Sequence, residues 1–250
     1  MDFKEILEHH ILDHHFGPHF LGLSKHLLMM WIAAGALILL FKVLFKSEGA
    51  LARKTKVVFE MLVLFIRDDV VVPAMGEAGK KYLHYFLSLF FFILFCNLLG
   101  LIPGASTPTG NIAVTATLAL CTFSLIHIAG IREHGVGHYI HSIVPSGLPG
   151  WLVPIMFPIE LIGFLTKTFA LSIRLFMNMI AGHIVILAFL GLIFIFGAMN
   201  PWLGLATSPV SVILSLFIYF LELAIVVPLQ AFIFTFLTAL FVGAAVRPEH

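Results

Sequence analysis

The chain has 250 residues, a formal net charge of +1, and a composition that is 60% hydrophobic and 11% charged, with a mean hydropathy of +1.08. This composition is too apolar for a soluble globular domain, and it predicts an all-α polytopic membrane protein that forms a single membrane domain over 1–250. The near-neutral charge leaves no basic footprint for nucleic acid.

The first 26 residues (1–26) form an acidic, histidine-rich leader. No small-residue cleavage signal follows the first apolar run, so we expect a retained external segment rather than a signal peptide. After this leader, hydropathy and length predict three membrane spans, at 27–45, 82–102 and 112–131.

The connection between the first two spans contains an amphipathic stretch at 53–72. Its apolar residues fall at helical spacing opposite its charged ones, which favours a helix lying in the cytoplasmic membrane interface. A docking surface for a partner subunit is an equally open alternative. The apolar residues are Val57, Val58, Met61, Leu62, Leu64 and Phe65, and the charged ones are Lys56, Glu60 and Arg67.

Two unusually long apolar segments follow, at 158–197 and 209–246. Each has about 40 residues, on the order of 60 Å as a helix, which is about twice the hydrocarbon thickness of a bilayer. Such helices cannot stand upright in the membrane. We expect a tilted antiparallel hairpin joined by a loop at 198–208, where Asn200-Pro201 is a turn signal.

Basic residues are confined to one side of this predicted topology. The 46–81 connection contains seven Lys and Arg residues, whereas the 103–110 and 198–208 loops contain none. By the positive-inside rule the 46–81 side is cytoplasmic. We therefore expect the N-terminus outside, and the 132–153 connection and the C-terminus inside.

Arg174 lies near the middle of the 158–197 span. A guanidinium does not lose its proton in a protein, and a charge at the centre of a membrane helix costs about 2.5–3.5 kcal/mol on insertion scales. An arginine in this position is therefore first interpreted as part of an ion path. The alternative is that its side chain extends to the membrane interface or pairs with a carboxylate on a neighbouring helix.

Other polar residues share the two long helices with Arg174. Glu160, Lys167 and Arg174 are seven apart and fall on one face, Asn178 follows one turn later, and His183 falls on the opposite face. Glu160 and Lys167 are candidates for lining an inner proton path. A role in an interfacial salt bridge is an equally open alternative.

A register argument pairs the two long helices. Facing residues of an antiparallel hairpin have position numbers with a constant sum, which sets Arg174 level with Gln230 and His183 level with Glu222. A histidine beside a glutamate can relay protons, because imidazole titrates near neutral pH. The alternative for His183 and Glu222 is a purely structural hydrogen-bonded pair. The alternative for Gln230 is a structural hydrogen bond that holds two helices together.

Three segments resemble subunit a of rotary F-type ATP synthases, and together they cover nearly the whole chain in order. The segments are Pro158-Ile-Glu-Leu-Ile-Gly through Arg174-Leu-Phe-Met-Asn-Met-Ile-Ala-Gly-His183, Leu229-Gln-Ala-Phe-Ile-Phe near the C-terminus, and Asn97-Leu-Leu-Gly-Leu-Ile-Pro103. One spacing departs from the resemblance: Glu222 stands eight residues before Gln230, where seven is expected.

This resemblance implies a stator proton-channel subunit of the Fo sector of a bacterial plasma membrane ATP synthase. Its partners would be a ring of c subunits, peripheral-stalk b subunits and the rest of the complex. It also implies that Arg174 faces the ring carboxylate between two offset half-channels, that Asn178 and Gln230 lie near it, and that His183 lines the outer half-channel with Glu222.

Two other classes are compatible with parts of the sequence. A membrane di-iron oxidoreductase would need clustered histidines, but the two clusters are predicted on opposite sides of the membrane. A secondary transporter would show repeats and broken helices. We expect no metal centre, no cofactor and no phosphate-binding loop, and the two cysteines indicate neither a disulfide nor a zinc site. The clusters are His9, His10, His14, His15 and His19, and His134, His138 and His141.

Overall fold

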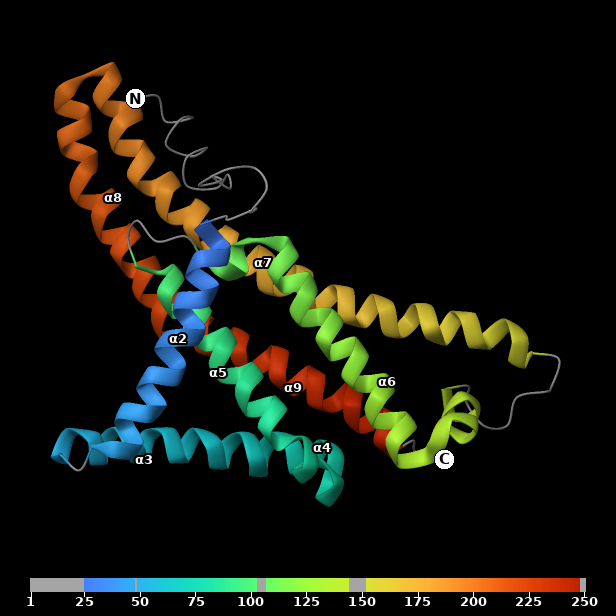
Figure 1. Cartoon of the computed structure of the whole chain (residues 1–250). Coiled ribbons are helices and arrows are strands. Elements are labelled where there is room, and N and C mark those ends of the chain that lie inside the picture. The colour runs from blue at the N-terminus through green and yellow to red at the C-terminus, as the bar shows by residue number, and fades with distance from the viewer. Residues whose placement is uncertain (1–24, 48, 103–106, 144–151, 248–250) are drawn as a thin grey trace, which may run out of the picture.

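The computed structural model describes residues 25–47, 49–102, 107–143 and 152–247, and all regular structure in these ranges is helical (Figure 1). The N-terminal histidine cluster lies outside the described residues. Five helical stretches in the described part are long and apolar enough to cross a membrane, which matches the number predicted from hydropathy.

The helices of the N-terminal half meet at sharp angles (Figure 1). Helix α2 (Lys25–Lys46) meets α3 (Ala50–Phe65) at a sharp corner, and α3 continues through a π-turn, η1 (Ile66–Val71), into the short α4 (Val72–Met75). The chain then reverses at Gly76, whose φ of 62° is in the left-handed region that favours glycine. A 3₁₀ segment, η2 (Gly76–Tyr82), leads into α5 (Leu83–Gly100).

Helix α6 (Ile112–Ile143) follows a short 3₁₀ turn, η3 (Pro108–Gly110), and extends well beyond the predicted span. It is broken at Gly135, where φ is 75°. The chain beyond this break folds back, so that the Tyr139 ring lies against Gly130 and its hydroxyl is 2.8 Å from Nδ1 of His127.

The C-terminal half consists of α7 (Val153–Met199), α8 (Pro201–Leu221), a second π-turn η4 (Glu222–Val226), and α9 (Val227–Val246). The predicted 198–208 loop is wrong, because Asn200 alone is non-helical between α7 and α8. Its side-chain oxygen accepts a hydrogen bond of 3.0 Å from the Trp202 amide, and Pro201 occupies the first turn, where its missing N–H costs nothing.

Helices α7 and α8 run side by side and antiparallel from this turn (Figure 1). They approach most closely at two glycines, because a Cβ atom added to Gly204 would lie 2.6 Å from the Cα of Gly197. Small residues at a helix crossing allow such contact in a membrane. Toward the opposite end, α9 diverges from α7, and α6 packs against both.

Both π-turns precede a proline by two residues. The amides of Val72 and Val227 donate to the carbonyls of Arg67 and Glu222, five residues earlier, and the prolines Pro73 and Pro228 follow directly. Proline has no N–H to donate, and its ring clashes with the carbonyl four residues before it. A widened turn with one extra residue accommodates that clash.

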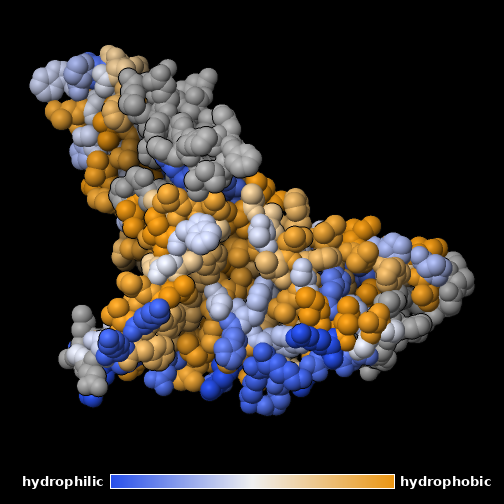
Figure 2. Space-filling model, in the orientation of Figure 1, coloured by the Kyte–Doolittle hydropathy of each residue, from blue (hydrophilic) through white to orange (hydrophobic). Residues whose placement is uncertain are grey.

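The buried core lies where η1, α4, α5, α6 and α9 meet, around Ile66, Met75, Phe86, Ile126 and Val242. Most of the remaining surface is hydrophobic, whereas hydrophilic residues gather along the lower edge of the molecule, where α3 and the C-terminal end lie (Figure 2). This distribution is the one expected of a protein surrounded by lipid with one polar rim.

We predict that Gly243→Val destabilises the protein. A Cβ atom at Gly243 would collide with the backbone carbonyl of Ala74, so α9 and α4 would have to separate at the core, at a cost of about 1–3 kcal/mol. The measurement is the thermal unfolding midpoint of the purified subunit in detergent. Gly35→Val is the control, since its Cβ meets nothing within 4 Å, and equal midpoints for the two variants would contradict this packing.

Candidate functional site

Arg174 lies on the exposed side of α7. Exposed side chains on the same stretch of α7 are the apolar Phe169, Ile173 and Met177 and the polar Asn178. No carboxylate in the described part of the chain pairs with the Arg174 guanidinium. The described residues therefore do not neutralise this charge.

Gln230 holds the backbone of Arg174 from the neighbouring helix. Its amide nitrogen on α9 donates a 3.0 Å hydrogen bond to the Arg174 carbonyl, and the Gln230 side chain is buried. The two residues therefore lie at one level, as the constant-sum register requires. Because the amide is neutral and bonds only to the backbone, it orients this turn of α7 without weakening the positive charge.

Glu222 is buried at 2% exposure, and its carboxylate lies directly against Gly182 on α7. A Cβ atom at Gly182 would overlap the carboxylate oxygen, so any larger residue here requires the Glu222 side chain to move. Within the described residues, neither carboxylate oxygen has a hydrogen-bond partner. Sequence reasoning missed Gly182, although the small pair Ala181-Gly182 is the type of motif that permits close helix contact.

His183 lies level with Glu222 but contacts a different helix. Its Nε2 atom is 3.2 Å from the Gly100 carbonyl at the end of α5, and its Nδ1 atom is 2.9 Å from the Met179 carbonyl. The alternative of a direct hydrogen-bonded pair between His183 and Glu222 is wrong for this structure. Carbonyls only accept, so a neutral imidazole can satisfy one of the two and a doubly protonated ring both.

Tyr219 joins His183 at the same helix end. Its hydroxyl donates to the Leu101 carbonyl at 3.1 Å. The last carbonyls of a helix lack partners within that helix, and here side chains from α7 and α8 supply them. This contact ties the polar end of α5 to the level of Glu222.

A cavity of about 400 Å³ lies between α7 and the α8–α9 segment. Asn178, Glu222 and Gln230 supply its polar lining, and aliphatic side chains supply most of the rest. Arg174 is one turn from Asn178 and bonded to Gln230, so its level adjoins the cavity. The structure therefore brings Asn178, Glu222 and Gln230 together, with His183 outside the cavity wall.

The eight-residue spacing between Glu222 and Gln230 has a structural explanation. Eight residues of α-helix would rotate the second side chain about 80° away from the first, whereas seven leave it about 20° away. The π-turn at Glu222–Val226 absorbs the extra residue. Both side chains consequently face the same cavity, although the sequence spacing alone sets them apart.

An interfacial salt bridge was one alternative for Glu160 and Lys167, and neither residue forms one with another described residue. The Lys167 ammonium lies over the rings of Phe164 and Phe241, at 5.3 and 5.9 Å from their centroids. These are favourable cation–π distances. Glu160 is half-buried two turns earlier on α7.

This architecture defines a polytopic α-helical membrane protein with an arginine that no described residue pairs with, a buried carboxylate, and a cavity between α7 and the α8–α9 segment. A family model for the ATP synthase A chain matches residues 27–243. The chain is 45% identical to ATP synthase subunit a of Myxococcus xanthus over 239 residues, which cover 92% of this chain and 75% of the relative. It is 42% identical to ATP synthase subunit a of Chloroherpeton thalassium over 265 residues, covering 96% of this chain and 76% of the relative. The chain therefore belongs to the ATP synthase A chain family.

We predict that Gly182→Ala impairs proton transport by displacing the Glu222 carboxylate. ATP-driven acidification of inverted membrane vesicles should fall severalfold, and Glu222→Asp in the same chain should recover part of it, because the shorter side chain leaves room for the methyl group. Gly163→Ala, also on α7, is the control, since its Cβ would make only an ordinary 3.9 Å contact with Glu160. Full pumping by Gly182→Ala would show that the contact with Glu222 is unimportant.

Proposed function

We propose that this chain is the stator proton-channel subunit of a rotary ATP synthase in a bacterial plasma membrane. In this proposal it lies beside a ring of c subunits, is held by peripheral-stalk b subunits, and has its N-terminus outside and its C-terminus in the cytoplasm. Family membership supports the complex. The observation that carries the mechanism is Arg174, an exposed charge on α7 that has no ion-pair partner among the described residues.

The exposed face around Arg174 suits a moving partner that brings its own carboxylate. Such a carboxylate must lose a proton on one side of a barrier and regain one on the other. A fixed guanidinium stabilises its ionised form in a poorly screened environment and repels protons that would cross directly. Gln230 keeps the Arg174 backbone at that level without competing for the charge.

The cavity and Glu222 form the outer half-channel in this proposal. Glu222 accepts a proton from the outer side, with His183 at the same level as a second titratable group. The Asn178 and Gln230 side chains supply hydrogen-bonding groups along the cavity toward the level of Arg174. A carboxylate without a protein partner is suited to exchange protons, because no competing bond must break first.

The inner half-channel opens, in this proposal, toward the beginning of α7. Glu160 and Lys167 are its candidate lining residues, on the α7 face that leads to Arg174. The divergence of α9 from α7 in this region separates the two long helices (Figure 1). The two paths therefore approach Arg174 from opposite ends of α7 and stay offset.

We predict that Arg174→Ala abolishes coupled ATP synthesis and ATP-driven pumping and allows passive proton leakage through the assembled complex. Arg174→Lys should fail as well, because lysine can lose its charge when desolvated and lacks the planar fork. Acidification of membrane vesicles is measured on preparations whose assembly is verified. Ile173→Ala, on the same exposed face, is the control and should pump normally; near-normal pumping by assembled Arg174→Ala would refute the mechanism.

A separate prediction concerns the outer path. Glu222→Gln and His183→Ala should each slow synthesis and pumping together while the complex still assembles, and exchanging the two residues should recover part of the activity. The controls are Glu60→Gln and His84→Ala, which change exposed residues of α3 and α5. Unchanged proton flux in both single variants would remove Glu222 and His183 from the path.

A further inference from the structure

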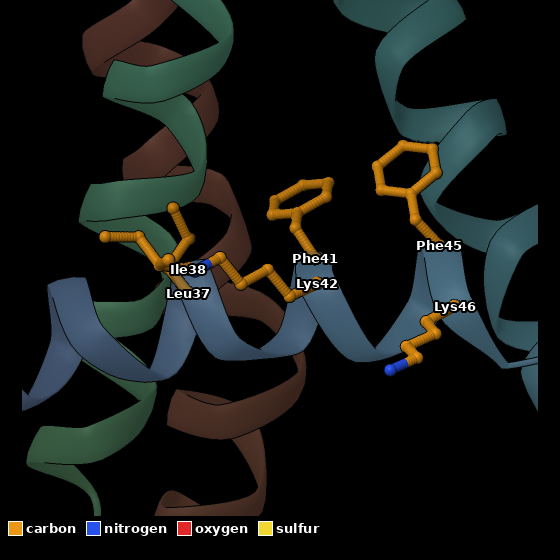
Figure 3. A pocket seen from close by; sticks show the side chains of 6 residues that line it. All are labelled: Leu37, Ile38, Phe41, Lys42, Phe45 and Lys46. Atoms are coloured by element: carbon orange, nitrogen blue, oxygen red, sulfur yellow. The ribbon is translucent and has the colours of Figure 1, made fainter.

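A second hollow lies along α2, far in sequence from the site around Arg174. Six described residues line this groove of about 620 Å³: Leu37, Ile38, Phe41, Lys42, Phe45 and Lys46 (Figure 3). They form two adjacent rows at four-residue spacing, one apolar and aromatic and the other ending in two lysines. Rows of this kind are the ridges of a helix surface, and the groove follows them.

The aromatic row is anchored to the rest of the fold through Phe41. The Phe41 ring packs edge-on against Phe59 of α3 at 5.4 Å and against Phe91 of α5 at 5.6 Å between ring centroids. Phe45 stacks on Phe41 at 6.3 Å, and it remains 80% exposed. The groove therefore has one apolar wall, which the described residues leave open to the lipid.

The second row ends in two lysines, and the described residues that line the groove include no acid. Lys42 and Lys46 are exposed, and neither forms an ion pair with another described residue. Figure 3 shows the Lys42 side chain lying back along the helix toward Ile38, while Lys46 points away from the aromatic row. Basic charge continues onto α3 with Arg53 and Lys54, next to the corner that the Lys56 ammonium closes by donating to the Ser47 carbonyl at 2.9 Å.

The dimensions of the groove fit one leaflet of a bilayer. From Leu37 to the helix end at Lys46 the rise is about 14 Å, close to half of the roughly 30 Å hydrocarbon thickness. Lys46 thus lies near the headgroup level, Lys42 lies one turn deeper, and the aromatic row lies beside the acyl chains. We propose that this groove binds an anionic phospholipid, with its phosphate between Lys42 and Lys46 and an acyl chain along Leu37, Phe41 and Phe45.

A partner transmembrane helix is a poorer match for the same groove. To neutralise both lysines it would need acidic residues near the hydrocarbon boundary, and charges in a membrane helix are costly. A phospholipid phosphate already lies at this depth and reaches the groove by lateral diffusion. Basic pockets of membrane proteins select anionic headgroups in this way, each lysine contributing through charge attraction.

The test uses the intact ATP synthase complex in proteoliposomes that contain trace photoactivatable phosphatidylglycerol or phosphatidylcholine. The anionic probe should label the peptide that contains Leu37–Lys46 more strongly than the neutral probe. The double variant Lys42→Gln with Lys46→Gln should reduce labelling by the anionic probe on the order of tenfold. Replacing both lysines by Arg should preserve labelling, because the charge is retained.

The matched control removes the same charge elsewhere, as Lys80→Gln with Arg132→Gln, two exposed residues of other elements. This control should leave labelling of the groove unchanged. Equal labelling by the two probes, or labelling unaffected by the double Gln variant, would overturn the proposal. Cross-linking of a cysteine at Ile38 to another subunit, with no lipid labelling, would show instead that a partner helix fills the groove. The readout is labelling rather than activity, so it is independent of the proton-channel proposal.

Discussion

A lipid bilayer offers no hydrogen-bonding partners, so each polar group in the long helices must find one inside the protein or face water. The structure satisfies this constraint mainly with backbone carbonyls. Gln230 donates to the Arg174 carbonyl, Tyr219 donates to the Leu101 carbonyl, and His183 lies within bonding distance of the Gly100 carbonyl. Against this background, Arg174 and Glu222 are exceptions, because among the described residues their charged groups have no hydrogen-bond or ion-pair partner. A guanidinium and a buried carboxyl group without such partners are costly to keep, and the proposed proton path gives a physical reason to keep them.

Most of the fold could be predicted from the sequence, because the hydrocarbon thickness converts hydropathy directly into spans. That Arg174 and Gln230 face each other was also predictable, because the position numbers of facing residues in two antiparallel helices add up to a nearly constant sum. The absence of a long loop at 198–208 could not be predicted, because Asn200, Pro201 and Gly204 are turn signals in soluble proteins. Here proline begins a helix and glycine provides a close helix contact.

The contacts of the site were less predictable than its members. The acceptors of His183 are backbone carbonyls, which exist at every position and leave no mark in the sequence. Gly182 was missed because its importance depends on the carboxylate that faces it from a distant segment. The spacing of Glu222 had a local cause, since Pro228 forces the π-turn that restores its orientation. A proline six residues after an intramembrane acid, as Pro228 follows Glu222, therefore indicates that a π-turn can change which helical face the acid occupies.

In the proposed mechanism, the face around Arg174 must hold a partner and still let it move. Its exposed side chains on α7 and α9, such as Ile173, Met177 and Leu229, are aliphatic or thioether groups. Apolar contact is non-directional, so sliding along such a surface changes its energy little. A single charge on that surface adds the one position-dependent term, which is strongest when a carboxylate stands opposite. Had position 230 been acidic instead of Gln230, it would have neutralised this charge from within the subunit. The neutral amide therefore matters for the proposed motor, because it fixes the Arg174 backbone and leaves the guanidinium charge available to the partner.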